Sequence, residues 1–227
     1  MGLPLYLAMT AAEFTACSPL PDSPAWMACH FSPYGTGLTN LPPALPEKAM
    51  VILNDRIPIG SHDPEFILEQ LSRLSPACLL LDFQRPGIKE MAELVRVLGR
   101  EPEVPVGVAE PYGAITDGPV FLSPIPPDVP AEEYLAPWQG REIWLEAALG
   151  GLVWQVTESG AAAVDLGAAP DGGMADRDLC CHYRVTQGEN RTAFSLWRTR
   201  EDLDALLKKA AGFGVTRAVG LWQELGG

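Results

Sequence analysis

Residues 78–84 are Cys78-Leu79-Leu80-Leu81-Asp82-Phe83-Gln84, a short apolar run that ends in polar side chains. Apolar runs of this kind recur along the chain and are typical of strands buried on both faces, as in a parallel sheet. The sequence contains eight of them, at residues 3–9, 26–31, 49–54, 78–83, 104–109, 120–123, 142–147 and 218–222. Eight buried strands predict an α/β fold, a (β/α)8 or TIM-like barrel.

Three helices are expected between these strands. One follows Asp63-Pro64, which supplies an N-cap and a proline at the first helical position. The second covers residues 88–98 and is closed by Gly99, and the third runs from Thr199 to Ala211. Residues 110–118 are too short for a full helix, and a complete barrel takes about 250 residues. We therefore expect a small barrel with shortened or missing helices.

Residues 152–198 have a different pattern. Two pairs of alternating segments, 153–156 with 162–165 and 183–185 with 192–197, flank short polar and glycine-containing turns. This pattern predicts antiparallel hairpins. We expect a single domain over residues 1–227, with residues 152–198 as a β-hairpin insertion late in the chain.

The composition excludes several classes of protein. The 227 residues carry a net charge of −13, and 47% of them are apolar. Nucleic acids and anionic membrane surfaces select basic faces, so we expect neither as a partner. No apolar stretch approaches the roughly 18 residues of a membrane span. The sequence carries no signal for an oligomeric state.

Five cysteines without a Cys-x-x-Cys spacing argue against a disulfide scaffold. Cys29-His30 and Cys180-Cys181-His182 do not match the usual spacings of zinc ligands, so no metal is expected. No phosphate-binding glycine loop is present, and we expect no cofactor. The N-terminus lacks a basic secretory n-region. We expect a cytoplasmic protein, or a secreted one if a leader has been removed.

Polar residues cluster where the expected strands end. Asp55, Asp82, Gln84, Glu110 and Glu146 each follow or close an apolar run. The carboxyl ends of parallel strands converge on one mouth of a barrel, where barrel enzymes place their chemistry. Two carboxylates about 5–10 Å apart serve glycoside cleavage as acid and base, or as acid and nucleophile. A single strand can also end in a polar residue simply because the core stops there.

Residues 77–87 resemble the fourth-strand signature of the family 18 glycoside hydrolases, the chitinase-like barrels, which reads D-G-x-D-x-D-W-E-Y-P. The last aspartate of the signature falls on Asp82, the aromatic residue on Phe83, the catalytic glutamate on Gln84 and the proline on Pro86. The first two aspartates are replaced by Ala77 and Leu80.

Two further segments resemble the same family in the same order. Residues 49–54 resemble its third strand, and residues 214–226 resemble its last strand. That last strand carries an aromatic residue under the sugar in the family, and the resemblance places Trp222 there. Glutamine has no titratable proton, so Gln84 cannot act as the general acid of the family mechanism.

The first functional hypothesis is therefore a chitinase-like barrel that binds a carbohydrate or glycan fragment, such as an oligosaccharide, without the usual hydrolysis. Amides and carboxylates would bind sugar hydroxyls, and aromatic side chains would cover the apolar ring faces. The expected ligand-binding residues are Asp55, Gln84, Tyr112, Trp144 and Trp222. Core packing is the competing interpretation for Trp144.

Two alternatives stay open. In one, the protein is an active glycoside hydrolase in which Glu146 pairs with Asp82 or with Glu110 as acid and nucleophile. In the other, it is a structural or interaction protein without a sugar site. The last alternative predicts that arginines such as Arg56 or Arg85 form salt bridges with the acids at the strand ends.

Overall fold

Eight parallel strands close into a barrel in the computed structural model, which describes residues 2–57, 60, 62–100 and 104–226. Along the barrel the neighbours are β1, β14, β8, β7, β6, β5, β4 and β2, and pairing of β1 with β2 closes the ring. The expected barrel class is confirmed. Its strands are β1 (Leu5–Met9), β2 (Pro24–Phe31), β4 (Met50–Asn54), β5 (Cys78–Asp82), β6 (Val106–Ala109), β7 (Val120–Leu122), β8 (Ile143–Ala147) and β14 (Val215–Leu221).

Successive side chains of each strand point to opposite faces of the barrel wall. In β5, Cys78 and Leu80 belong to the core inside the barrel, whereas Leu79 and Leu81 belong to the core outside it. Both faces of the strand are therefore buried. This explains why the strands are continuous apolar runs in the sequence rather than alternating ones.

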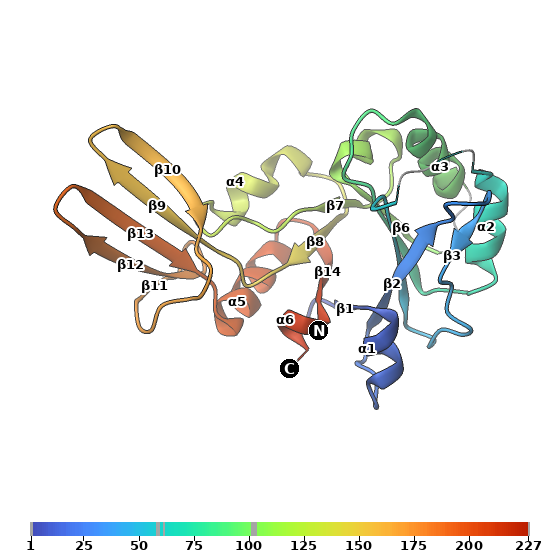
Figure 1. Cartoon of the computed structure of the whole chain (residues 1–227), viewed down its shortest axis with the longest axis horizontal. Coiled ribbons are helices and arrows are strands. Elements are labelled where there is room, and N and C mark those ends of the chain that lie inside the picture. The colour runs from blue at the N-terminus through green and yellow to red at the C-terminus, as the bar shows by residue number, and fades with distance from the viewer. Residues whose placement is uncertain (1, 58–59, 61, 101–103, 227) are drawn as a thin grey trace. The chain divides into compact units, whose positions relative to one another are not determined.

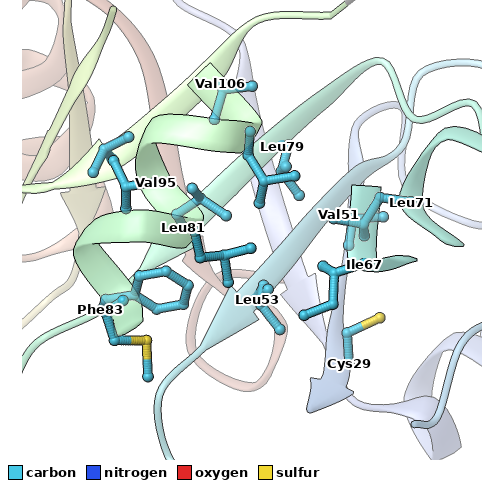
Figure 2. Packing of buried hydrophobic residues seen from close by; sticks show 14 of the residues in the cluster. Cys29, Val51, Leu53, Ile67, Leu71, Leu79, Leu81, Phe83, Val95 and Val106 are labelled. Atoms are coloured by element: carbon cyan, nitrogen blue, oxygen red, sulfur yellow. The ribbon is translucent and has the colours of Figure 1, made fainter. Parts of the chain in front are cut away.

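Two helices cover the outer face of β4, β5 and β6 (Figures 1 and 2). They are α2 (Pro64–Ser72) and α3 (Lys89–Arg100). The side chain of Asp63 caps α2 by accepting hydrogen bonds from the backbone N–H groups of Glu65 and Phe66. The prediction that Gly99 closes the next helix is wrong, because α3 continues through Gly99 to Arg100. Figure 2 shows the outer core built from Val51, Leu53, Leu79, Leu81, Ile67, Leu71 and Val95.

As the sequence predicts, the described connections between β1 and β4 and between β6 and β8 carry only short helices. The β6–β7 connection contains only a 3-10 helix, η1 (Glu110–Ile115). Strand β3 (Leu38–Thr39) pairs antiparallel with β2. The other short elements are α1 (Ala11–Ala16), α4 (Ala131–Leu135), η2 (Ala136–Trp138) and α6 (Trp222–Leu225).

The late insertion is a five-stranded antiparallel sheet with the order β10-β9-β13-β12-β11. Both expected hairpins are confirmed, and pairing of β9 with β13 joins them. A short strand, β11, was not expected. The strands are β9 (Gly151–Thr157), β10 (Gly160–Asp165), β11 (Met174–Asp176), β12 (Cys181–Gln187) and β13 (Arg191–Trp197). Helix α5 (Arg200–Ala211) follows, as expected, and a capping box between Thr199 and Asp202 begins it.

The chain forms two compact units. One contains Pro124–Gln139 and Ala147–Val215, and therefore the five-stranded sheet and α5; the other contains Pro4–Ser123, Gly140–Glu146 and the segment from Thr216 onward. The prediction of a single domain over residues 1–227 stays a prediction. None of the helices in the described ranges has the length and apolar character that crossing a bilayer requires.

Candidate functional site

The inward-facing residues of the barrel change from apolar to polar toward the carboxyl ends of the strands. In β4 the inner side chains are Met50 and Ile52, and the same alternation brings Asn54 inward at the end of the strand. In β5 the inner set ends with Asp82, and Asn54 lies directly opposite Asp82 in the register. Two neighbouring strands therefore end side by side with an amide and a carboxylate inside the barrel.

A cavity of about 90 Å³, here called the mouth cavity, lies at this end of the barrel. Its polar side chains are those of Asn54, Asp82 and Glu146. The rest of the lining comes from Ala8, Met27, Ile52, Leu80, Phe121, Val219, Gly220 and Leu221. Among the residues that the structure describes, no lysine, arginine or histidine contributes to this lining. The cavity therefore offers two carboxylates and one amide on an apolar floor.

The two carboxylates of the mouth cavity are both harder to ionise than usual. Burial raises the pKa of Asp82; the hydrogen bond from Gln84 opposes this shift, and the charge of Asp55 adds to it. Burial raises the pKa of Glu146, and the charges of Asp82 and Glu224 raise it further. Apolar surroundings and like charges both disfavour the ionised form. Raised carboxyl pKa values of this kind cluster at functional sites, although structural networks produce them too.

Gln84 does not line the mouth cavity, but it contacts Asp82, which does. Its side-chain amide nitrogen donates to a carboxylate oxygen of Asp82 at 2.5 Å, and the residue itself is exposed. The amide therefore orients the Asp82 carboxylate and carries no proton that can be transferred at ordinary pH.

Asp55 does not line the mouth cavity. It forms an ion pair with Arg85, whose Nε lies 3.1 Å from Oδ2 of Asp55, and a pair of this kind is what the structural alternative predicts. The backbone N–H of Arg85 donates to the same oxygen, and the Arg85 guanidinium also donates to the Asp55 carbonyl. Burial acts to raise the pKa of Asp55, but the hydrogen bonds from Arg85 outweigh it and hold this pKa below its usual value.

Tyr112 also holds the loop that contains Arg85. Its ring is buried in the outer core, and its hydroxyl donates to the carbonyl of Arg85 and accepts from the backbone N–H of Ile88. Asp55 and Tyr112 thus hold the loop that carries Gln84. Both belong to the support of the site, and neither lines the mouth cavity.

The structure does not bring Glu110, Trp144 and Trp222 into the mouth cavity either. Glu110 is exposed at the start of η1. Trp144 is fully buried in the inner core. Its ring occupies the space that a Cβ atom at position 107 would need, so only glycine leaves room for the ring there. The indole N–H of Trp144 donates to Glu142. The ring of Trp222 packs against the backbone of Gly226.

Asn54 is the polar cavity residue that the sequence analysis missed. The alternation of β4 was a signal for it, because Met50, Ile52 and Asn54 share one face and Asp55 lies on the other. Among the described residues no group of three or more His, Cys, Asp or Glu side chains is arranged to hold a metal ion. The buried thiols are poor ligands and nucleophiles as they stand, since burial raises the pKa of Cys29 to about 12 and that of Cys181 to about 11.

No protein-family model and no curated protein matches this sequence. Solved structures do match it. A GH18 chitinase mutant from Cycas revoluta in complex with (GlcNAc)4 is 11% identical, with a TM-score of 0.56 over 96% of this chain and 94% of the other. A chitinase from Chromobacterium violaceum is 11% identical, with a TM-score of 0.55 over 96% and 93%.

The spore cortex-lytic enzyme SleL of Bacillus cereus is 13% identical, with a TM-score of 0.53 over 96% of this chain and 70% of the other. At such low identities these matches concern the fold. The chain has a chitinase-like barrel of the kind found in family 18 glycoside hydrolases, as the motif around Asp82 indicated.

Proposed function

We propose that the barrel mouth binds a carbohydrate, and that it does so without the hydrolysis typical of chitinase-like barrels. The observation that carries this proposal is the mouth cavity itself, with Asn54, Asp82 and Glu146 on an apolar floor. Carboxylates and amides in such a setting are acceptors for hydroxyl groups, and an apolar floor suits the C–H faces of a sugar. Gln84, at the position of the family's catalytic glutamate, supplies no transferable proton.

The size of the cavity limits what it holds. Its volume is about 90 Å³. Sites that enclose a whole drug-sized ligand measure about 300–1,000 Å³. The mouth cavity therefore takes one substituent of a sugar, while the rest of the glycan lies outside it.

Calorimetric titration with chitin oligosaccharides and soluble peptidoglycan fragments tests this proposal. We expect binding without release of reducing ends. Asp82→Ala should weaken the binding at least about tenfold, which corresponds to 1.4 kcal/mol. Asp117→Ala is the matched control, because Asp117 is exposed in the loop that precedes β7, at the amino end of that strand. No heat of binding for any glycan, or equal effects of the two substitutions, would contradict the proposal.

The raised pKa values of Asp82 and Glu146 favour a second candidate, an active glycoside hydrolase that uses this pair. A carboxyl group that keeps its proton toward neutral pH can act as a general acid beside an ionised partner. In this candidate Glu146 and Asp82 share one cavity, whereas Glu110 does not line it. Turnover of an aryl glycoside that is lost in Glu146→Gln and kept in Asp117→Asn would establish it.

We also propose a cytoplasmic location. Its support is that the five cysteines, all within the described residues, are free thiols, and four of them are buried. Cell fractionation tests this, and recovery of the native protein from the medium would contradict it.

A further inference from the structure

One face of the five-stranded sheet is apolar and exposed. Directly opposed residues of antiparallel neighbours share a face, and in this register Trp154 opposes Ala163 and Phe194, while Phe194 opposes Val185. We call this side the apolar sheet face. It contains Leu152, Trp154, Val156, Ala161, Ala163, Asp165, Met174, Asp176, Cys181, Tyr183, Val185, Gln187, Thr192, Phe194 and Leu196.

The outer part of this face is open to solvent. Val156 and Phe194 are each 39% exposed, and Val185 is 41% exposed. Ala161 and Ala163 of β10 are exposed as well. In the middle of β9, the indole N–H of Trp154 donates to Asp128 at 2.9 Å, which holds the ring in place. An antiparallel sheet ordinarily packs its apolar face on a second layer. Among the described residues of the unit that contains this sheet, none covers the open part.

We propose that the missing layer is a second copy of this chain, packed face to face through the apolar sheet face about a twofold axis. Two sheets packed in this way form a β-sandwich, with the layers about 10 Å apart. The inference is independent of any glycan in the barrel. It concerns residues of the insertion alone.

The first argument for a second copy is that the face is complementary to itself. The twofold axis of this arrangement lies midway between the two facing sheets, is parallel to the strands, and passes above the gap between β9 and β13. It places β9 of one copy over β13 of the other copy, and β10 of one copy over β12 of the other. Trp154 then meets Phe194 of the partner subunit, and Leu152 meets Leu196 of the partner subunit. The small side chain of Ala163 meets the larger Val185 of the partner subunit. Large residues facing small ones let two layers interdigitate.

The second argument is charge. Every large side chain of the face is uncharged, and its acidic members, Asp165 and Asp176, are at strand ends. In the same arrangement Asp165 lies over Tyr183 of the partner subunit, whose hydroxyl is a hydrogen-bond donor. The like charges of two chains of −13 each oppose association at long range. Salt screens that repulsion over about 8 Å at physiological ionic strength, so the dimer should strengthen as salt is added.

The third argument is area. The four strands that overlap in this arrangement are six or seven residues long. At a spacing of about 4.8 Å they present a face of about 400 Å² per copy. Two copies then bury about 800 Å², which is below the size of standard specific interfaces and typical of weak contacts. An interface of this size is typical of a reversible dimer and not of an obligate one.

Sedimentation equilibrium of the full chain tests the proposal. We expect a reversible monomer–dimer equilibrium in the micromolar range that tightens as sodium chloride is raised. Phe194→Lys should weaken the dimer at least tenfold, because a charge at the centre of the face would be buried against the partner. Val185→Lys should act in the same direction.

Val164→Lys is the matched control. Val164 is the neighbour of Ala163 in β10, is 45% exposed and points to the other face of the same sheet. It should leave the dissociation constant within about twofold, and circular dichroism should show that all variants keep the wild-type fold. A wild-type chain that stays monomeric at every concentration and salt level would overturn the proposal. So would a Val164→Lys variant that dissociates as fully as Phe194→Lys.

Discussion

The barrel and the five-stranded sheet bury their apolar residues in different ways. Barrel strands β2, β4 and β5 each contribute residues to both an inner and an outer core, and the eight barrel strands pair into a closed ring. The inserted sheet is a single layer with two free edges, β10 and β11, and every residue of β10 is exposed. Apolar side chains therefore stabilise the fold in the barrel, whereas in the sheet they are available for contacts with another molecule.

The difference has a functional side. The barrel tolerates two repelling carboxylates, Asp82 and Glu146, because the many buried apolar side chains of its two cores stabilise the fold by more than this repulsion costs. The sheet lacks such stabilisation, since only its base is covered. Substitutions at matched positions of the two regions test this comparison.

The largest expected effect is that of Trp144→Ala in the barrel. Trp144 is fully buried, and loss of such a side chain costs about 3–5 kcal/mol of unfolding free energy. Trp154→Ala in the sheet should cost well under half as much, because Trp154 is partly exposed. Urea unfolding of both variants measures the contrast. Equal losses would show that the sheet is as tightly packed as the barrel.

Arg198→Met should cause the next largest loss of unfolding free energy. It tests the base of the inserted region, which is covered. Arg198 is 5% exposed, and its guanidinium donates to the carbonyl oxygens of Cys180, Ile125 and Pro126. The substitution leaves these buried acceptors unpaired, at a cost of about 1–3 kcal/mol for such groups. The exposed Arg184→Met is the control and should change the unfolding free energy by less than about 0.5 kcal/mol.

Gly107→Ala sharpens the comparison inside the barrel. A Cβ atom at this position of β6 would overlap the ring of Trp144, and such overpacking typically costs about 1–3 kcal/mol. Gly2→Ala is a control with open space around it. If the thermal midpoint of Gly107→Ala equalled that of the wild type, the inner core would be looser than the structure indicates.

The smallest effect concerns the carboxylates of the mouth cavity. Their folded pKa values are raised, so the folded state binds protons more tightly than the unfolded state does. The unfolding free energy therefore falls as pH rises from the ordinary pKa values, 3.8 for Asp82 and 4.5 for Glu146, through the raised pKa values of the folded state.

Glu146→Gln removes that penalty. It should raise the unfolding free energy at pH 7 on the order of 1 kcal/mol or less, and leave it nearly unchanged at pH 3. Denaturant titrations at the two pH values provide the measurement. A variant less stable than the wild type at pH 7 would mean that the ionised carboxylate has a stabilising partner.

Much of the barrel was predictable because its signals are local. The eight apolar runs, the cap at Asp63 and the capping box at Thr199 each depend on a few adjacent residues. The end of α3 was not predictable. A Cβ atom at position 99 would lie too close to the side chain of Thr116, and this contact accounts for the glycine, although the helix does not end there. The sequence around Gly99 does not reveal this contact. The resemblance around Asp82 identified the kind of barrel, although few residues carried it.

The candidate site was predictable only in part. The sequence by itself determined that polar residues end the barrel strands and that an amide stands at Gln84. The tertiary structure decided that Asn54, Asp82 and Glu146 share one cavity, and that Asp55 and Tyr112 hold the loop beside it. The reason is physical: a strand end depends on a few adjacent side chains, whereas a cavity depends on the register between strands distant in the sequence.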